Sequence, residues 1–238
     1  MHSRLAIMIY ALAFGVLSLR FPVTAIGAEI FVSGSAVHIV GLIETGDDER
    51  FRTAVSRAIQ EHPGEPVQSL RIYSSGGNLD AALKIGDQVY ALQLETWAPE
   101  KFPNGRWKCE IVKTVISFDP KTQGGDSRCV CASACFFIWA AGAVREGEIL
   151  GVHRPSFNAN EFASLSPSDA RLRYDALLKN TKASLQKWGI PEDIVDAVFS
   201  INSASISFLN QSENVCTVLQ PSMNKLLRSA ATCYPENS

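Results

Sequence analysis

Strand-like and helix-like segments alternate through the first hundred residues of the chain. Short stretches rich in apolar and β-branched residues predict strands, whereas apolar residues at three- and four-residue spacing predict amphipathic helices. The alternation is typical of an α/β fold with a mostly parallel sheet and flanking helices. The predicted strands cover 29–33, 36–43, 67–73 and 94–98, and the predicted helices cover 49–61 and 79–92.

The second half of the chain resumes this pattern after an interruption. Residues 99–130 are polar and rich in turn residues, with one strand-like run at 111–118. We expect an insertion there, such as a hairpin, joined by cysteines to the segment around Ser133. A lid or substrate-edge role is one interpretation, and loop decoration is the simpler one. The apolar run 136–143 is too short to span a membrane but suits a buried helix. Further predicted elements are a strand at 149–152, helices at 167–188, 191–201 and 221–231, and a short strand or turn at 206–209.

The N-terminus has the pattern of a secretory signal peptide. Arg4 precedes an apolar segment over 5–19, and small residues follow at Gly27 and Ala28. Cleavage after Ala28, which ends a signal peptide of residues 1–28, leaves one expected domain, 29–238, in the periplasm or secreted. A retained anchor is the alternative. Because the apolar segment is shorter than the roughly 20 residues needed to cross a bilayer, we expect no stable membrane insertion once the signal is removed.

The net charge and the length of the chain narrow the range of functions and folds further. The 238-residue chain has a formal net charge of -2 and a pI near 6.1. It has no basic tract interleaved with aromatic residues, so we do not expect nucleic acid as a partner. The expected mature length suits a single α/β domain with a sizeable core.

Six cysteines lie in the expected mature chain, and an even number in an exported protein favours disulfides. We predict one bridge between Cys216 and Cys233 and leave the other pairings open. A Cys131–Cys135 bridge would fix the backbone around Ser133, although that spacing is poor inside a regular helix. Zinc is the competing interpretation, but CxC and CxxxC spacings do not fit paired zinc ligands, so we expect neither a metal nor another cofactor. The cysteines are Cys109, Cys129, Cys131, Cys135, Cys216 and Cys233.

Ser133 and His153 stand at the ends of predicted elements. Ser133 precedes the apolar helix and lies between two alanines that leave room around its hydroxyl, and His153 follows the strand 149–152. Two such residues can meet at one edge of an α/β sheet as a nucleophile and its general base. The simpler interpretation is that Ser133 only caps the helix and that His153 is an ordinary surface residue.

Gly76 and Gly77 lie at the predicted junction between the strand 67–73 and the helix 79–92. A Gly-Gly turn permits unusual dihedral angles and lets a ligand approach the backbone closely. Its N–H groups would then suit an oxyanion. The alternative is a plain tight turn, and the G-x-G-x-x-G pattern of dinucleotide sites is missing.

Taken in order, these motifs resemble the proteolytic subunit of the Clp protease, within the crotonase-like superfamily. The resemblance covers roughly residues 36–155, with a weaker continuation to about 201, and the chain is most similar to exported bacterial Clp-protease-like proteins. It implies a ββα-repeat spiral with a mostly parallel sheet. The motifs that carry it are G-L-I-E-T-G, L-R-I-Y-S-S-G-G, C-A-S-A-C and G-V-H-R-P.

The resemblance also implies a chemistry. Ser133 would attack an acyl carbon with His153 as general base, and the oxyanion hole would come from the Gly76-Gly77 turn and the N–H of Ala134. Peptide bonds are the implied substrate. Since an exported chain meets no ATP-driven unfoldase, we expect short or unfolded peptides. Assembly into a homo-oligomer is implied by the resemblance alone.

At the same site, this sequence departs from the family pattern in two ways. The turn has Ser-Ser-Gly-Gly where the family has Ser-Pro-Gly-Gly. The family's third triad residue is an Asp in a later loop, and the corresponding region, 202–207, has none. Asn202 is a candidate to orient His153, whereas Asp193 and Asp196 fall inside a predicted helix. Without such a residue, a Ser–His dyad remains.

Two other functions compete with an exported serine hydrolase. A catalytically inactive binding or assembly protein would use the same surface, and the missing Asp favours it. A crotonase-type acyl-CoA enzyme would place a thioester in the same oxyanion hole. However, the chain has no adenine-nucleotide motif, and export removes it from CoA.

Overall fold

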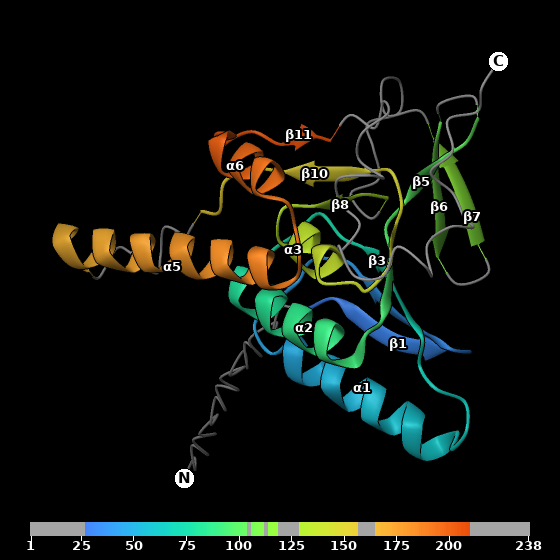
Figure 1. The fold of residues 1–238 in the computed structure, drawn as a ribbon. Helices are drawn as coiled ribbons and strands as arrows, with labels where there is room; N and C mark the ends of the chain where they lie inside the picture. The colour runs from blue at the N-terminus through green and yellow to red at the C-terminus, as the bar shows by residue number, and fades with distance from the viewer. Residues whose placement is uncertain (1–26, 104–105, 112–113, 119–128, 157–164, 210–238) are drawn as a thin grey trace, which may run out of the picture.

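The described part of the chain forms a mixed α/β fold (Figure 1). The computed structural model describes residues 27–103, 106–111, 114–118, 129–156 and 165–209. The largest sheet within them holds β1 (Glu29–Ser33), β2 (Ala36–Val40), β3 (Ser69–Tyr73), β4 (Glu95–Trp97) and β9 (Arg145–Glu146). Its order is β1-β2-β3-β4-β9. The β1–β2 pair is antiparallel and the later pairs are parallel, so the α/β class expected from the sequence is confirmed.

A second sheet extends the first at the level of β3. It holds β8 (Cys131–Ala132), β10 (Leu150–Val152) and β11 (Ser207–Phe208). β8 and β10 are parallel, and β11 runs antiparallel to β10. A parallel bridge between Ser74, directly after β3, and Cys131 connects the two sheets. The C-terminal ends of β3, β8 and β10 therefore lie at the same edge.

The insertion expected at 99–130 contains a third, antiparallel sheet. It holds β5 (Glu100–Lys101), β6 (Trp107–Ile111) and β7 (Thr114–Phe118). β6 and β7 pair along their full length, from Trp107 opposite Phe118 to Ile111 opposite Thr114. The expected hairpin is present as the antiparallel β6–β7 pair, and the lid or substrate-edge role stays a prediction.

The helices follow the predicted apolar periodicity closely. Asn78 caps α2, because its Oδ1 accepts the N–H of Ala81 at 2.8 Å. α1 begins earlier than predicted, since the buried carboxylate of Asp47 accepts the N–H groups of Ala28 and Glu44 at 3.1 and 2.9 Å. The helices are α1 (Asp47–Glu61), α2 (Leu79–Leu92), α3 (Ala134–Ala140), α5 (Pro167–Lys187) and α6 (Glu192–Ser200).

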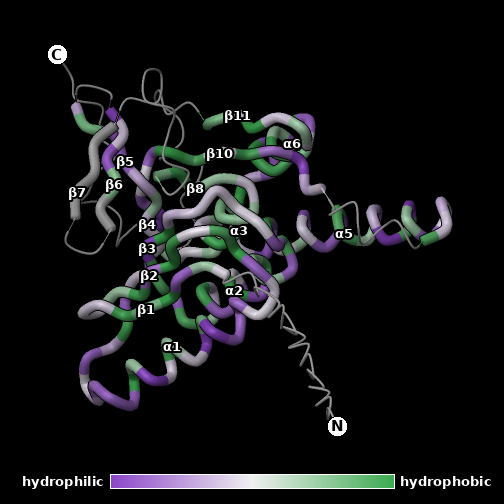
Figure 2. Tube along the Cα trace, turned by 180° about the vertical axis from the view of Figure 1, so that it is seen from behind, coloured by the Kyte–Doolittle hydropathy of each residue, from purple (hydrophilic) through white to green (hydrophobic). Residues whose placement is uncertain are grey.

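The short helix α3 lies at the centre of the molecule. All seven of its residues are buried, and it packs against α2 on one side and against β8 and β10 on the other. Figure 2 shows hydrophobic stretches gathered in this middle layer and hydrophilic ones along the outer turns of α1 and α5. Burial of an all-apolar helix of this length supplies much of the hydrophobic stabilisation of the fold.

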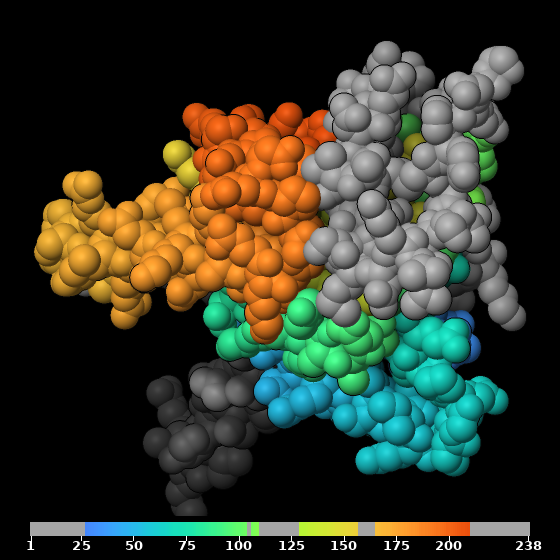
Figure 3. Space-filling model, in the orientation of Figure 1, coloured from blue at the N-terminus to red at the C-terminus, as the bar shows by residue number. Residues whose placement is uncertain are grey.

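In contrast to α3, the helix α5 projects beyond the rest of the molecule (Figure 3). Its buried residues, Thr181 and Leu185, belong to its C-terminal half. That half is held by Trp188, whose ring packs on Gly86 of α2, and by an ion pair of Lys182 with Asp196 of α6 at 3.0 Å.

Several expectations fall outside the described residues. These are the apolar segment 5–19, the Cys216–Cys233 bridge and the closing helix at 221–231. In the part of the chain that is described, no helix combines the length and the apolarity needed to cross a bilayer. Among the described residues, four strands were not predicted: β5, β6, β8 and β9. β5, β8 and β9 have only two residues each, too few to show a pattern. The run 111–118, predicted as one strand, falls on two, since β6 ends at Ile111 and β7 begins at Thr114.

Candidate active site

Three parallel segments bring the predicted site residues to one edge of the sheets. The Ser74–Gly77 turn follows β3, Ser133 follows β8, and His153 follows β10. Ligands in open α/β sheets bind outside the carboxyl ends of the strands. The topology therefore assembles residues that are up to 79 positions apart, from Ser74 to His153.

Ser133 has a backbone conformation that side chains rarely adopt. Its φ and ψ are 56° and -121°, and Gln93 is the one other non-glycine residue with positive φ among the described residues. The Ser133 N–H donates to the carbonyl of Gly151 on β10 at 2.9 Å. Its hydroxyl makes no capping hydrogen bond to α3. Ser133 therefore occupies the N-cap position, while its hydroxyl is left for another partner.

That partner is His153. Its Nε2 lies 2.7 Å from the Oγ of Ser133, and its Nδ1 lies 2.8 Å from the carbonyl oxygen of Arg154. A carbonyl oxygen only accepts hydrogen bonds, so Nδ1 carries the proton and donates it there. Nε2 of the neutral ring then has the free lone pair, and the Ser133 hydroxyl donates to it. This is the tautomer in which an imidazole acts as a general base toward a serine.

Gly76 lies directly against Ser133. With φ at 110°, it has a conformation that favours glycine, and a Cβ added there would come within 2.6 Å of the Ser133 Cβ and 3.0 Å of the Ala134 nitrogen. The Gly76 N–H, which we expected in an oxyanion hole, donates to the Oγ of Ser74 at 3.1 Å. Gly76 thus supplies space next to the serine rather than a free donor.

The amides of Gly77 and Ala134 remain as donors. Ala134 is the first residue of α3, so its N–H has no partner within the helix. For the Gly77 N–H, no acceptor occurs among the residues that the structure describes. The turn around Gly77 is held by Ile43, whose N–H donates to the Gly76 carbonyl at 2.8 Å and whose carbonyl accepts the Asn78 N–H at 2.7 Å.

None of the three candidates for a third triad residue is hydrogen-bonded to His153. Asn202 is exposed, and its Oδ1 accepts the N–H of Ala204 at 2.9 Å. Asp196 pairs with Lys182, and Asp193 lies in the first turn of α6. Within the described residues, the group that orients His153 is the carbonyl of Arg154.

Sequence reasoning missed the supporting roles of Ser74 and of the Arg154 carbonyl. Ser-containing turns often fold the hydroxyl back onto a nearby backbone N–H, so Ser74 was recognisable as a turn residue. Backbone groups such as the Arg154 carbonyl have no signature in a sequence.

Two disulfides surround the site. Cys109 of β6 is bonded to Cys129, and Cys131 is bonded to Cys135. The poor geometry expected for the second pair applies to a regular helix, and these two cysteines do not share one. Cys131 lies in β8, and the chain turns at Ser133 before α3 begins, so the two Cα atoms are 5.2 Å apart, within the usual range. Sulfur atoms in a disulfide offer no thiolate to a metal.

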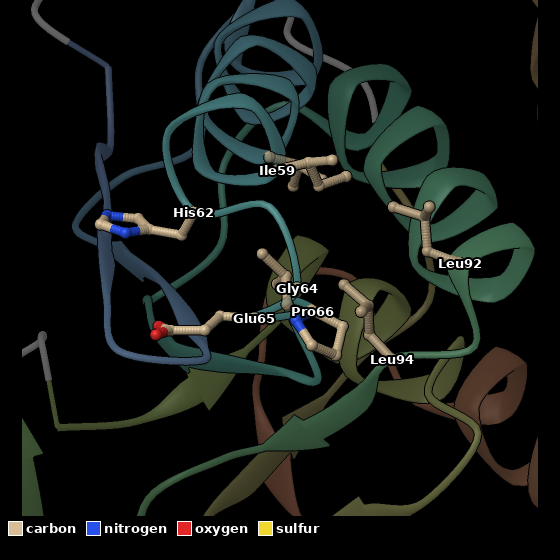
Figure 4. A pocket seen from close by; sticks show the side chains of 9 residues that line it. Ile59, His62, Gly64, Glu65, Pro66, Leu92 and Leu94 are labelled. Carbon is tan, nitrogen blue, oxygen red and sulfur yellow. The ribbon is translucent and has the colours of Figure 1, made fainter.

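A hollow of about 350 Å³ lies elsewhere, between the C-terminal ends of α1 and α2 (Figure 4). Its walls are mostly apolar, with Ile59 and Leu92 at the sides, and its ionisable residues are His62 and Glu65. It contains no nucleophilic side chain. The Ser133–His153 pair, and not this hollow, is therefore the candidate active site.

Comparison with the models of known protein families gives no match for this chain, and comparison with curated proteins gives none either.

Proposed function

We propose that this protein is an exported serine hydrolase with Ser133 as nucleophile and His153 as general base, acting on short or unfolded peptides. The observation that carries the proposal is the 2.7 Å contact between Oγ of Ser133 and Nε2 of His153. The Nδ1 contact with the Arg154 carbonyl supports it, because it selects the tautomer that accepts the serine proton.

The proposed reaction proceeds by acyl transfer. As Oγ of Ser133 attacks the substrate carbonyl carbon, its proton passes to Nε2 of His153. The N–H groups of Gly77 and Ala134 donate to the oxyanion that forms on the carbonyl oxygen. The imidazolium then protonates the leaving amine as the C–N bond breaks. A water molecule releases the acyl group by the same steps, with His153 again taking and returning the proton.

A backbone carbonyl in place of a carboxylate is expected to lower the catalytic rate. When a triad loses its carboxylate, the main damage is selection of the wrong histidine tautomer, worth about 10⁴ in rate. The Arg154 carbonyl already selects the productive tautomer. It brings no negative charge to stabilise the imidazolium, so we expect a slow but functional dyad.

The direct test is labelling with a fluorophosphonate probe, which bonds to an activated serine hydroxyl. Wild-type protein is expected to be labelled, Ser133→Ala to lose the label completely, and His153→Ala to be labelled at least about 100-fold more slowly, which is the lower end of general-base contributions. Mass spectrometry of the labelled peptide identifies the modified residue. A folded wild type that takes up no label would refute the proposal.

The alternative is a binding or assembly protein that has the same architecture but no turnover. Among the described residues, His153 Nδ1 contacts a backbone carbonyl and no carboxylate, which favours it. It predicts that a bound peptide is retained equally by wild type and Ser133→Ala and is cleaved by neither. Peptide cleavage that disappears with Ser133→Ala excludes this alternative.

The proposal extends to fold family and location. The parallel pairing of β2, β3, β4 and β9, together with the β3–β8 bridge, is compatible with the ββα-repeat spiral of Clp-protease-like proteins, which we propose as the family. Two disulfides are consistent with an exported protein, and we propose the N-terminal segment as its signal peptide. Homo-oligomer formation is part of the same proposal.

A further inference from the structure

The Ser133 turn, the segment Cys131–Cys135, is closed by a disulfide between its two ends. We propose that the Cys131–Cys135 disulfide is a positioning device, which holds Ser133 in its reactive conformation. This inference rests on the proposed function. It assigns to two cysteines a role in the reaction rather than in overall stability alone.

Ser133 has a strained backbone conformation. A non-glycine residue in a sparsely populated region of φ and ψ persists only when its surroundings enforce it. Gln93, the other described non-glycine residue with positive φ, is a common left-handed helix end with φ and ψ of 55° and 37°. Ser133, with ψ at -121°, has no such routine explanation. Neighbouring groups must therefore prevent the backbone of Ser133 from relaxing to a common conformation.

The most favourable relaxed state is also identifiable. Ser133 precedes an apolar helix, and a serine there ordinarily adopts an extended conformation and caps the helix with its own hydroxyl. If the helix instead grew backward through the turn, the Cβ atoms of residues 131 and 135 would be about 5–6 Å apart. A disulfide requires about 3.5–4.5 Å. The bridge therefore excludes a regular helix that continues from residue 135 back to residue 131.

The two ends of the bridge are themselves fixed. Cys131 pairs with Leu150 of β10, Cys135 belongs to the first turn of the buried helix α3, and both cysteines are fully buried. The bridge thus joins the strand before Ser133 to the helix after it. Together with the hydrogen bond from Ser133 N–H to Gly151, it directs the hydroxyl toward His153.

The other disulfide provides a matched control. Cys109–Cys129 is also fully buried and lies close by in sequence, but it does not enclose Ser133. It spans 20 residues, whereas Cys131–Cys135 spans 4. Because disulfide stabilisation grows with loop length in the chain-entropy model, removal of Cys109–Cys129 should cost more stability. We therefore expect loss of Cys109–Cys129 to lower the stability more, and loss of Cys131–Cys135 to lower the reactivity of Ser133 more.

The experiment compares two double variants of the full chain, Cys131→Ala/Cys135→Ala and Cys109→Ala/Cys129→Ala. Circular dichroism and urea unfolding establish that each is folded and how stable it is. The second-order rate of fluorophosphonate labelling then reports the reactivity of Ser133. We expect at least a tenfold lower rate for the first variant and a rate within about twofold of wild type for the second, although the second is the less stable protein.

A substrate assay adds a readout that a purely structural role would not change. With an activated peptide ester, loss of positioning lowers kcat and leaves KM nearly unchanged, since the substrate contacts remain. If the first variant does not fold, the wild type is treated with a dithiol, which reduces the disulfide to two thiols and is itself oxidised to a cyclic disulfide. Labelling should then fall as thiols appear at Cys131 and Cys135 and recover on reoxidation.

The outcomes separate the two proposals. If the wild type is labelled and the Cys131→Ala/Cys135→Ala variant or the reduced protein is labelled equally fast, the positioning role is overturned. The proposal of a serine hydrolase is then unaffected. Parallel loss of labelling in both double variants also overturns it, because general destabilisation would then be the cause. An unlabelled wild type with both disulfides present instead refutes the proposed function.

Discussion

Single residues set the geometry around Ser133, and Gly76 shows how narrow the tolerance is. A Cβ at this position would meet the Ser133 Cβ at 2.6 Å and the Ala132 carbonyl oxygen at 2.8 Å. Contacts this short force the neighbouring atoms to move, and both neighbours belong to the strand and turn that present the nucleophile. The lack of a side chain at Gly76 therefore decides whether Ser133 and His153 can come into contact.

We predict that Gly76→Ala inactivates the site. The positive φ of 110° alone costs about 1–2 kcal/mol for an alanine, and the contact with Ser133 adds about 1–3 kcal/mol. The matched control is Gly64→Ala, because Gly64 has a φ of 103° with nothing within 4 Å of the added Cβ. Both variants should lose stability in urea unfolding, but only Gly76→Ala should reduce fluorophosphonate labelling, by tenfold or more. Equal labelling of the two would contradict the packing argument.

At the scale of elements, the insertion hairpin is attached to the strand that leads to the nucleophile. β6 carries Cys109, and its partner Cys129 lies two residues before β8 begins with Cys131. Trp107 of β6 makes an edge-to-face contact with Phe208 of β11, with ring centroids 5.3 Å apart. The hairpin is thus fixed to the second sheet by covalent and apolar contacts, close to the proposed active site.

This attachment predicts a specific disulfide map. Trypsin without reductant should release the peptide 109–113 bonded to the peptide 129–145, which contains three cysteines. Fragmentation after Val130 should leave residue 129 with the first peptide and a closed loop between Cys131 and Cys135. Mass spectrometry with and without reduction checks this pairing. A fragment in which Cys109 is bonded to Cys131 or Cys135 would show that the arrangement around Ser133 is wrong.

At the scale of the whole molecule, Trp188 is one of the contacts that dock the C-terminal helices, beside the buried side chains of Leu185 and Val195. Trp188 is buried, and its ring lies on Gly86 in the middle of α2. Its carbonyl accepts a hydrogen bond from Arg145 of β9 at 2.6 Å. α2, α5 and β9 therefore meet at this residue, and the long projecting helix depends on it for its orientation.

We predict that Gly86→Ala destabilises the protein although alanine is the better helix former. The intrinsic preference favours alanine by about 1 kcal/mol. However, the new Cβ would lie 2.7 Å from Cη2 of Trp188, and overpacking of this kind costs about 1–3 kcal/mol. In the Trp188→Phe background, which removes the clashing atoms, the same substitution should become neutral or stabilising. Urea unfolding of the four proteins of this double-mutant cycle measures the coupling. Additive effects would refute the contact.

Much of the fold was predictable, because local patterns suffice where an element is long and amphipathic. Asn78 and the apolar spacing after it predicted the bounds of α2, and Ser133 and His153 were identified from their places at element ends. Predictions failed where the cause is not local. The strand 36–43 ends early, at Val40, since Gly41 adopts a φ of 105°. The positive φ of Ser133 could not be predicted, because the contacts around it come from β3, β8 and β10.

The sequence alone thus determined the order of the strands and helices, the candidate nucleophile and base, and the glycine turn. These features depend on periodicity and residue type, which are properties of residues close together along the chain. Only the tertiary structure decided that Ser133 and His153 touch, that a carbonyl rather than a side chain orients the histidine, and which cysteines pair. The physical reason is that parallel pairing brings together the ends of strands that are distant along the chain. Hydrogen bonds of the backbone then set geometry that no side-chain pattern encodes.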